Sequence, residues 1–437
     1  MARRTARNSR RPAAGAPDWS AEPAAGLTLA DLDPVEIARL RATVRSNPAR
    51  AALAELDDEA FLRALGAVND AGVTRAAALL AGRADVLARA FPQHEVVYLY
   101  EPTETEIAFR EDLKAPLLHL LGRLRDLVQR PERNPVHTLR AGLRHVAIPA
   151  FPEEAFREAV LNAVIHRDYL EPGSVYIHHR PREMVISSPG GFVGGITPAN
   201  ILHHEPVARN RLLAEIGQAA GLVERAGIGR RRIFIPCLTY GKRAPLYTAD
   251  RHSVTLTLFD GSVDEGLARW IAEEEEQGRE FDVVALLLLT HLKEHAEVDS
   301  AEAAELCQLP LRLMRDRLER LVMERGTWIE RRGTGRNITY RLAPSAAAAL
   351  IGREALVIVR GIDRVRWPEM VRAYVGQHGA INNLECRELL GLGHSRSAQA
   401  RASQLLREWS EGPGGFLTRL GTGPRSFTYV PRNGPPS

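Results

Sequence analysis

Three polar side chains, spaced four residues apart, interrupt an otherwise apolar stretch of this chain. Glu158, Asn162 and His166 stand at i, i+4 and i+8, a spacing that places side chains on one face of a helix. The stretch is otherwise formed by Ala155, Phe156, Ala159, Val160, Leu161, Ala163, Val164 and Ile165. A buried glutamate or asparagine is costly unless a partner uses it. Asparagine offers a neutral oxygen to Mg²⁺ and glutamate can accept a proton from water, so the stripe predicts a metal–phosphate site.

Three further segments carry features of a nucleotide pocket. Two contain glycines, S-S-P-G-G-F at 187–192 and A-G-I-G-R-R-R-I at 226–233, and the third is the alternating strand H-S-V-T-L-T-L at 252–258. Glycines let a backbone approach a phosphate closely. Taken singly, each segment fits an ordinary turn or amphipathic element. Their order along the chain favours a single site.

Together the four segments resemble the GHKL superfamily, the ATP-binding fold of gyrase, histidine kinases and the mismatch-repair ATPases. The resemblance is closest to bacterial regulators described as RecG-like or Schlafen/AlbA-type ATP-binding proteins, and it implies an α/β domain built as an α+β sandwich. It also implies ATP and Mg²⁺ as cofactors, with Glu158 as the general base and Asn162 as the Mg²⁺ ligand. The ATP-binding residues that it implies are Asn162, His166, Arg167, Ser188, Gly190, Gly191, Gly227, Gly229 and Arg230.

Two positions in this set have alternative interpretations. Ser188 stands where the superfamily has an aspartate that reads the adenine amino group, and a serine there weakens adenine recognition. His166 fits a histidine that is hydrogen-bonded near the site as well as one that contacts the ligand. Whether ATP is slowly hydrolysed or only bound is left open.

Several similar motifs are excluded by their details. H-R-D at 166–168 imitates the catalytic loop of protein kinases, but that loop has an asparagine five residues after the aspartate, where this chain has Gly173. Glu111 stands in place of the phospho-acceptor histidine of histidine kinases. The chain also lacks a G-x-x-x-x-G-K-[ST] phosphate loop. We therefore expect neither a protein kinase nor a helicase motor.

The composition is that of a globular protein. Of 437 residues, 45% are hydrophobic and 26% are charged, and the net charge of +4 means that any nucleic-acid surface must be local. Cys237, Cys307 and Cys386 are far apart, which predicts reduced thiols, no zinc site and a cytoplasmic location. No apolar run is long enough to span a membrane.

The first 26 residues predict a disordered basic tail. The segment is rich in Ala, Pro and Gly and cannot bury a core. In relatives an AlbA-type DNA-binding domain precedes this point, and its absence here indicates either a shortened form or a lost domain. The basic residues of the tail are Arg3, Arg4, Arg7, Arg10 and Arg11.

Two segments follow the tail. Residues 27–134 predict a helical adaptor and a connecting helix, with helices at 73–90 and 106–129 on either side of a strand at 96–100. The GHKL-type ATP-binding domain is predicted at 135–262.

The C-terminal part contains two segments of similar design, 280–343 and 368–432. Each predicts three helices and a hairpin, and the hairpins share Gly-Thr-Gly at 333–335 and 421–423. This is the pattern of a winged helix-turn-helix, whose third helix enters the major groove while the hairpin contacts phosphates. The predicted DNA-binding residues are Arg312, Arg315, Arg331, Arg332, Arg336, Arg401, Arg419 and Arg425.

These features predict an ATP-binding, DNA-binding regulator of transcription. Binding or slow hydrolysis of Mg·ATP would switch the domain arrangement, double-stranded DNA is the predicted partner, and the resemblance leaves a homodimer open. One alternative is a DNA-binding transcription factor with a degenerate, structural nucleotide domain. The other is a protein-docking component of a signalling or defence complex.

Overall fold

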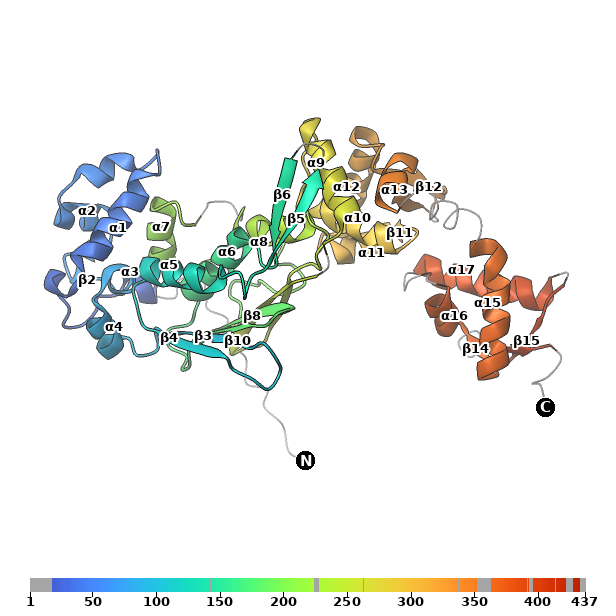
Figure 1. Cartoon of the computed structure of the whole chain (residues 1–437), viewed down its shortest axis with the longest axis horizontal. Coiled ribbons are helices and arrows are strands. Elements are labelled where there is room, and N and C mark those ends of the chain that lie inside the picture. Colours follow the sequence, from blue (N-terminus) through green and yellow to red (C-terminus); the bar gives the residue numbers. More distant parts are fainter. Residues whose placement is uncertain are drawn as a thin grey trace, which may run out of the picture. The chain divides into compact units, whose positions relative to one another are not determined.

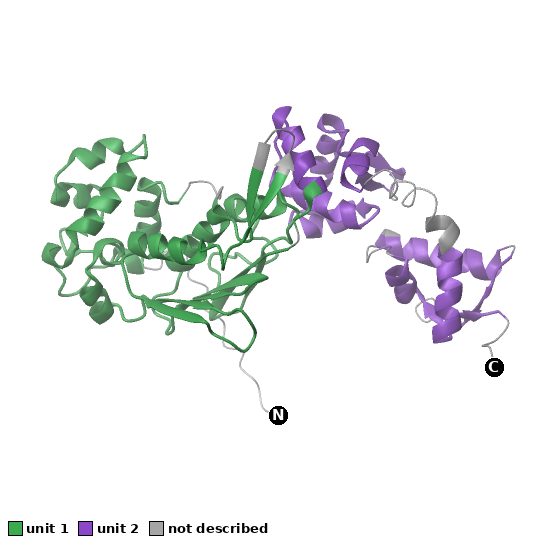
Figure 2. Cartoon of the chain, viewed as in Figure 1, with its two compact units in different colours: residues 1–265 green, residues 266–437 purple. Residues whose placement is uncertain are grey.

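The chain divides into two compact units, residues 1–265 and 266–437 (Figure 2). The structure is a computed structural model, and it describes residues 18–141, 144–223, 228–261, 263–335, 338–351, 363–390, 392, 396–412, 414–421 and 427–432. Across these ranges no helix is both long and apolar enough to cross a membrane.

The first unit begins with a short segment that we call the N-terminal strap, residues 18–21, which contains the 3₁₀ helix η1 (Trp19–Ala21). Trp19 stacks on Tyr169, with ring centroids 4.5 Å apart, and Ser20 is fully buried. The strap lies within the segment predicted as a disordered tail, and these contacts explain why it is ordered. Residues 1–17 of that tail lie outside the described residues.

Short helices follow the strap, as the sequence predicted. Asp33 caps the first α-helix by accepting a hydrogen bond from the backbone N–H of Val35, with Pro34 at the first helical position. The single helix predicted at 73–90 is wrong, because Gly82 adopts an extended conformation and divides it in two. The elements are η2 (Leu29–Asp31), α1 (Pro34–Arg45), η3 (Ala51–Glu55), α2 (Asp58–Ala64), β1 (Val68–Asn69), β2 (Gly72–Val73), α3 (Arg75–Ala81) and α4 (Ala84–Ala90).

A six-stranded sheet forms the centre of this unit, in the order β4-β3-β7-β8-β10-β9. The β3–β7 pair is parallel and the other pairs are antiparallel. The strands are β3 (Val96–Tyr100), β4 (Phe109–Leu113), β7 (Val175–His179), β8 (Glu183–Pro189), β9 (Leu246–Ala249) and β10 (Ser253–Phe259). The sheet thus takes two strands from before residue 135, where the ATP-binding domain was predicted to begin.

The helix predicted at 106–129 is wrong in its first half. Phe109–Leu113 is strand β4, which pairs with β3 along its whole length. Helix α5 (Leu117–Val128) begins only after Pro116, whose fixed φ suits a helix start and disfavours helix in the residue before it.

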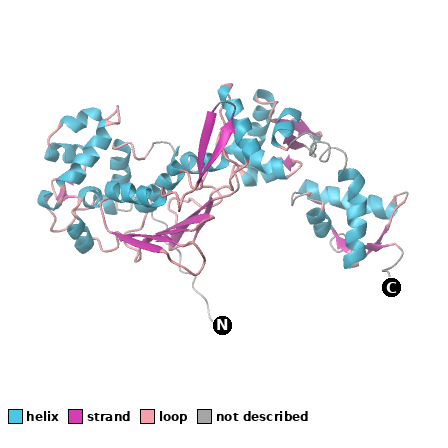
Figure 3. Cartoon of the chain, in the orientation of Figure 1, coloured by secondary structure: helices cyan, strands magenta, loops and turns pink. Residues whose placement is uncertain are grey.

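Helices cover one face of the sheet, which gives a two-layer α+β arrangement (Figures 1 and 3). Helix α6 (Glu153–Ile165) packs against α5, β8 and α8 (Ile228–Leu238). Alternate residues of β8 are buried, as expected for a sheet with one covered face. The remaining elements are α7 (Arg211–Ala219) and a separate hairpin of β5 (Val136–Ala141) and β6 (Arg144–Pro149).

The second unit contains two sets of three helices, each followed by a hairpin. In both sets the short first strand pairs with the last, giving the sheet orders β11-β13-β12 and β14-β16-β15. The first set has α10 (Val283–Glu294), β11 (Val298–Asp299), α11 (Ser300–Leu306), α12 (Leu311–Glu324), β12 (Ile329–Arg332) and β13 (Thr339–Leu342), between α9 (Glu265–Glu276) and α13 (Pro344–Leu350). The second set has α15 (Asp363–His378), β14 (Ile381–Asn382), α16 (Asn383–Leu389), α17 (Arg396–Glu411), β15 (Leu417–Leu420) and β16 (Thr428–Pro431).

Candidate nucleotide-binding site

A cavity of about 170 Å³ lies between α6, the sheet and the first turn of α8. The loop that follows β8 completes the wall, and the sheet contributes to it through β8, β9 and β10. The predicted general base and most of the residues that the sequence assigned to ATP binding line this one cavity, although they come from separate segments. They are Glu158, Asn162, His166, Ser188, Gly190, Gly191, Gly229 and Arg230.

Glu158 and Asn162 form a hydrogen-bonded pair on α6. Asn162 Nδ2 donates to Glu158 Oε1 at 3.1 Å, and Glu158 is only 5% exposed. This bond uses the amide nitrogen of Asn162 and leaves the amide oxygen as the acceptor of the side chain. The pair therefore presents a fixed carboxylate and a neutral oxygen donor, as the residue spacing predicted.

The backbone of α8 lies directly against this carboxylate. A Cβ atom placed on Gly229 would lie 2.1 Å from Glu158 Oε1, far inside contact distance. Glycine at this position therefore allows α8 to approach Glu158 without displacing its carboxylate. The start of the helix brings the positive end of its dipole to the cavity, which favours an anion there.

Arg230 is the cation of the cavity. Partial burial lowers the pKa of its guanidinium, and Tyr247 acts in the opposite direction. One Nη atom donates to the carbonyl of Ile201. A guanidinium that is partly removed from water in this way is stabilised by a bound anion. His166, the residue that caps the C-terminus of α6, is exposed where it lines the cavity.

The opposite part of the wall is largely apolar. It includes Ile186 and Ser188 of β8 and Val254 and Leu256 of β10. Ser188 is 7% exposed, and its hydroxyl donates to the carbonyl of Ala163 at 2.6 Å. This bond directs the hydroxyl to α6, and a serine at this position provides no acidic group for a nucleobase.

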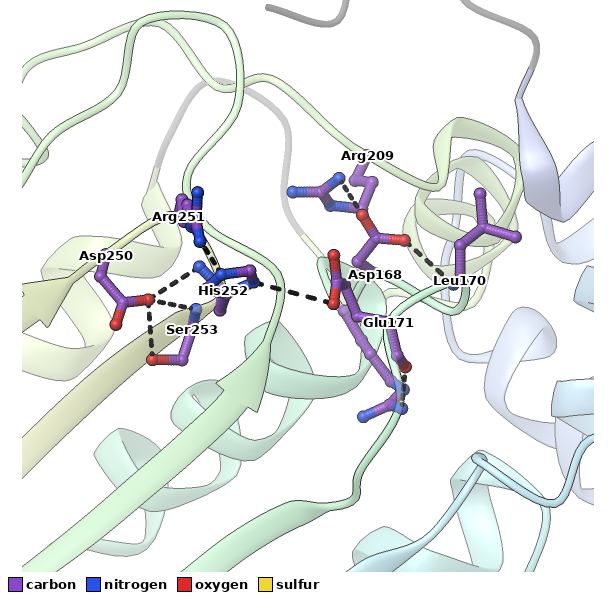
Figure 4. Close-up of polar contacts among 9 residues, drawn as sticks. Asp168, Leu170, Glu171, Arg209, Asp250, Arg251, His252 and Ser253 are labelled. Carbon is purple, nitrogen blue, oxygen red and sulfur yellow. Dashed lines mark hydrogen bonds and ion pairs between the residues drawn. The ribbon is translucent and has the colours of Figure 1, made fainter. Parts of the chain in front are cut away.

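The glycine turn after β8 is packed too tightly for any side chain. Gly190 has φ +94°, and a Cβ there would lie 2.5 Å from Asp168 Cβ. A Cβ on Gly191 would lie 2.4 Å from the carbonyl oxygen of Asp250. Asp250 itself caps the β9–β10 turn by accepting hydrogen bonds from the N–H groups of His252 and Ser253 (Figure 4). The two glycines are therefore needed where α6, β8 and β10 meet.

One predicted ATP-binding residue that the structure describes, Arg167, is not among the residues that line the cavity. Arg167 is 1% exposed and donates to the carbonyls of Glu171 and Gly173 at 3.1 and 2.7 Å, which fixes the loop after α6. Gly227 lies outside the described residues.

Residues that the sequence did not single out also shape the site. Tyr247 lines the cavity, and burial together with the charge of Glu158 raises the pKa of its hydroxyl. Arg209 and Asn210 join the loop after α6 to the glycine turn and to α7. The only available signal for this pair was a polar Arg-Asn dipeptide directly before an amphipathic helix.

The predicted DNA-binding arginines differ in their surroundings. Arg312 and Arg315 on α12, Arg331 and Arg332 on β12, and Arg419 on β15 are all exposed. Three form ion pairs: Arg331 lies 3.6 Å from Glu319, Arg419 lies 3.5 Å from Glu411, and the half-buried Arg401 lies 2.5 Å from Glu297. Arg336 and Arg425 lie outside the described residues.

Comparisons with known proteins agree with the class of this site. Residues 174–258 match the family model described as "Putative ATP-dependent DNA helicase recG C-terminal". The chain therefore contains an ATPase-like domain related to that region. Ser188, the glycine turn, Gly229 and Arg230 fall inside the match, whereas Glu158 and Asn162 precede it.

Other matches are less informative about function. Residues 7–97 match a model described as "Domain of unknown function (DUF8451)". The crystal structure of the DIP2311 protein from Corynebacterium diphtheriae is similar, with a TM-score of 0.62 and 23% identity over 78% of this chain and 67% of that chain. This likeness concerns the fold alone. No curated protein matches the chain.

Proposed function

We propose that the ATPase-like domain binds Mg·ATP in the cavity between α6 and the sheet. The observation that carries the proposal is the convergence in one cavity of Glu158, Asn162, the glycine turn, Gly229 and Arg230. Different parts of the cavity wall suit the base and the phosphates of a nucleotide. An apolar wall suits a base, and the start of α8 with Arg230 suits phosphates.

The donor set fits a magnesium ion that is shared with phosphates. Within the described ranges, no three His, Cys, Asp or Glu side chains gather as a metal-binding group. Magnesium in phosphate sites is usually held by one or two protein oxygens, waters and the phosphates themselves. Asn162 would supply the protein oxygen, and the bound ion would neutralise phosphate charge.

Glu158 would act as the general base in slow hydrolysis. Its carboxylate is buried, and Asn162 holds one of its oxygens in place. A fixed carboxylate of this kind can accept a proton from water that attacks a phosphate. Residues from two helices would thus have separate roles: on α6, Asn162 on the ion and Glu158 on the water, and on α8, Arg230 on phosphate charge.

We further propose that the two C-terminal sets are winged helix-turn-helix domains that bind double-stranded DNA. The order of helices and strands in each set is that of this motif, and α12 carries Arg312 and Arg315 on its exposed side. Binding of Mg·ATP would then regulate DNA binding, and dimerisation of the chain would fit such a regulator.

A degenerate nucleotide domain is the second candidate. Ser188 favours it, because a serine offers a base no acidic partner and its hydroxyl already donates to the carbonyl of Ala163. In that case the domain would be a scaffold for a DNA-binding protein. The proposal and this alternative differ in one measurable property, which is nucleotide affinity.

The test is an equilibrium titration of the full chain with ATP in the presence and absence of Mg²⁺. We expect saturable binding that is tighter with Mg²⁺. Absence of binding at millimolar ATP would refute the nucleotide proposal and support the scaffold. A parallel titration with a DNA duplex near 100 mM salt tests the C-terminal domains, and no binding there would indicate protein-docking modules.

A further inference from the structure

We infer that Arg209 is a positioning residue, which holds the Gly190–Gly191 turn against the end of α6 and so determines nucleotide affinity. The inference rests on the proposed function, because it takes the cavity to be a nucleotide-binding site. It concerns a residue that lies beside the cavity wall rather than in it. Figure 4 shows the side chain of Arg209 directed at the carboxylate of Asp168.

Arg209 joins two segments that are distant in sequence. Its Nη1 donates to Asp168 Oδ2 and its Nη2 donates to the carbonyl of Gly191, both at 2.7 Å. Asp168 follows α6, while Gly191 belongs to the turn after β8. One guanidinium therefore fixes the separation between the helix that carries Glu158 and the turn that forms part of the cavity wall.

The geometry needs an arginine rather than any cation. The two Nη groups reach two different acceptors at once, which a planar guanidinium can do and a single ammonium cannot do in the same geometry. Arg209 Nε is buried and has no hydrogen-bond partner among the described residues, so the hydrogen bonds of this side chain are those of its two Nη groups. The ion pair is partly shielded from water, with 21% and 23% of the two side chains exposed.

The next residue fixes the same end of α6. Asn210 is 1% exposed, and its Nδ2 donates to the carbonyls of Ile165 and Arg167 at 2.8 Å each. These bonds anchor the chain on which Arg209 stands. Pro206 and Val207, just before it, line the cavity. A shift of Arg209 would therefore move the turn and this neighbouring part of the wall together.

The experiment compares Arg209→Met with Arg123→Met in the full chain. Arg123 is a matched control, because it makes two 2.7 Å bonds to the carboxylate of Glu111 and lies outside the cavity wall. We expect Arg209→Met to weaken Mg·ATP binding at least about tenfold, and Arg123→Met to leave the dissociation constant unchanged within about threefold. The dissociation constant of Arg209→Lys should lie between those of wild type and Arg209→Met, because lysine keeps the charge but cannot donate to both acceptors in the same geometry.

Amide hydrogen exchange provides an independent measurement of how firmly the turn is held. We expect faster exchange in residues 186–196 of Arg209→Met and unchanged exchange there in Arg123→Met. If Arg209→Met does not fold, Asp168→Asn tests the same contact, with weaker binding and faster exchange expected.

The outcomes separate the two hypotheses. Wild-type affinity and wild-type exchange in Arg209→Met would overturn the positioning inference while leaving ATP binding intact. Faster exchange with unchanged affinity would overturn its link to nucleotide binding. If the wild type binds no nucleotide, the proposed function fails, and the exchange measurement alone decides whether Arg209 positions the turn.

Discussion

Replacing Gly229 with alanine should displace the carboxylate that we propose as the general base. The new Cβ would lie 2.1 Å from Glu158 Oε1 and 3.0 Å from Glu158 Cδ. Ordinary contacts need about 3.5 Å, so the carboxylate has to move by roughly 1.4 Å. A misplacement of about 1 Å at a reacting group can cost on the order of 10²-fold in rate, and we expect this loss in ATP turnover.

The same substitution should have little effect on folding. Gly229 lies in the first turn of α8, where alanine is the better helix former by about 1 kcal/mol. The atom that must move is the end of a flexible side chain, so the gain in helix propensity offsets much of the strain. We expect the free energy of unfolding to change by less than about 1 kcal/mol.

Gly122→Ala is the matched control, because it is also a glycine in a helix and a Cβ there would meet nothing within 4 Å. It should raise the free energy of unfolding by about 0.5–1 kcal/mol and leave nucleotide turnover unchanged. The assays are phosphate release under saturating Mg·ATP and urea denaturation of both variants. If Gly229→Ala turns over ATP at the wild-type rate, the position of Glu158 is unimportant and its role as base is refuted.

Four further predictions concern other parts of the chain. Asn162→Ala should weaken Mg·ATP binding by a few kcal/mol at most, and an unchanged dissociation constant in the titration would refute the metal assignment. Glu158→Gln should lower turnover about 10²–10⁴-fold while ATP remains bound; equal turnover would exclude a general base at this position. Asp18→Ala should lower the free energy of unfolding by about 1 kcal/mol in urea denaturation, because Asp18 accepts hydrogen bonds from the first N–H groups of α7. Arg332→Ala should weaken binding to all duplexes alike and make the slope of log affinity against log salt shallower by about 0.9, whereas Arg312→Ala should change the preferred sequence; the reverse pattern would contradict the proposed docking.

The sequence was informative where polar residues follow the helical period. Glu158 and Asn162 could be placed together because a spacing of four residues defines a helix face, and the structure brings them into hydrogen-bond contact. The glycines of the turn were recognisable by type. Their need for glycine arises from Asp168 and Asp250, which approach from elsewhere in the chain and leave no local signal.

The elements and residues that the sequence did not predict depend, likewise, on contacts between segments that are distant in sequence. Phe109–Leu113 contains charged residues that suit a helix, but pairing with β3 makes it a strand. Arg209 escaped prediction because its partner Asp168 lies 41 residues earlier, and no periodic pattern connects them. The three-helix-and-hairpin order of both C-terminal sets was predictable because each is local, with its elements adjacent in sequence.

A continuous line of contacts connects the N-terminal strap to the cavity wall. Asp18 caps the start of α7, Arg209 stands two residues before that helix, and its guanidinium holds Gly191. Contact alone does not establish coupling, which requires that one site bias the other. If nucleotide stabilises the turn and the turn stabilises the docked strap, linkage demands that loss of the strap weaken nucleotide binding by the same factor. Asp18→Ala therefore reports on more than stability: nucleotide affinity should fall in this variant if the line transmits free energy, and should stay at the wild-type value if the strap is only an anchor.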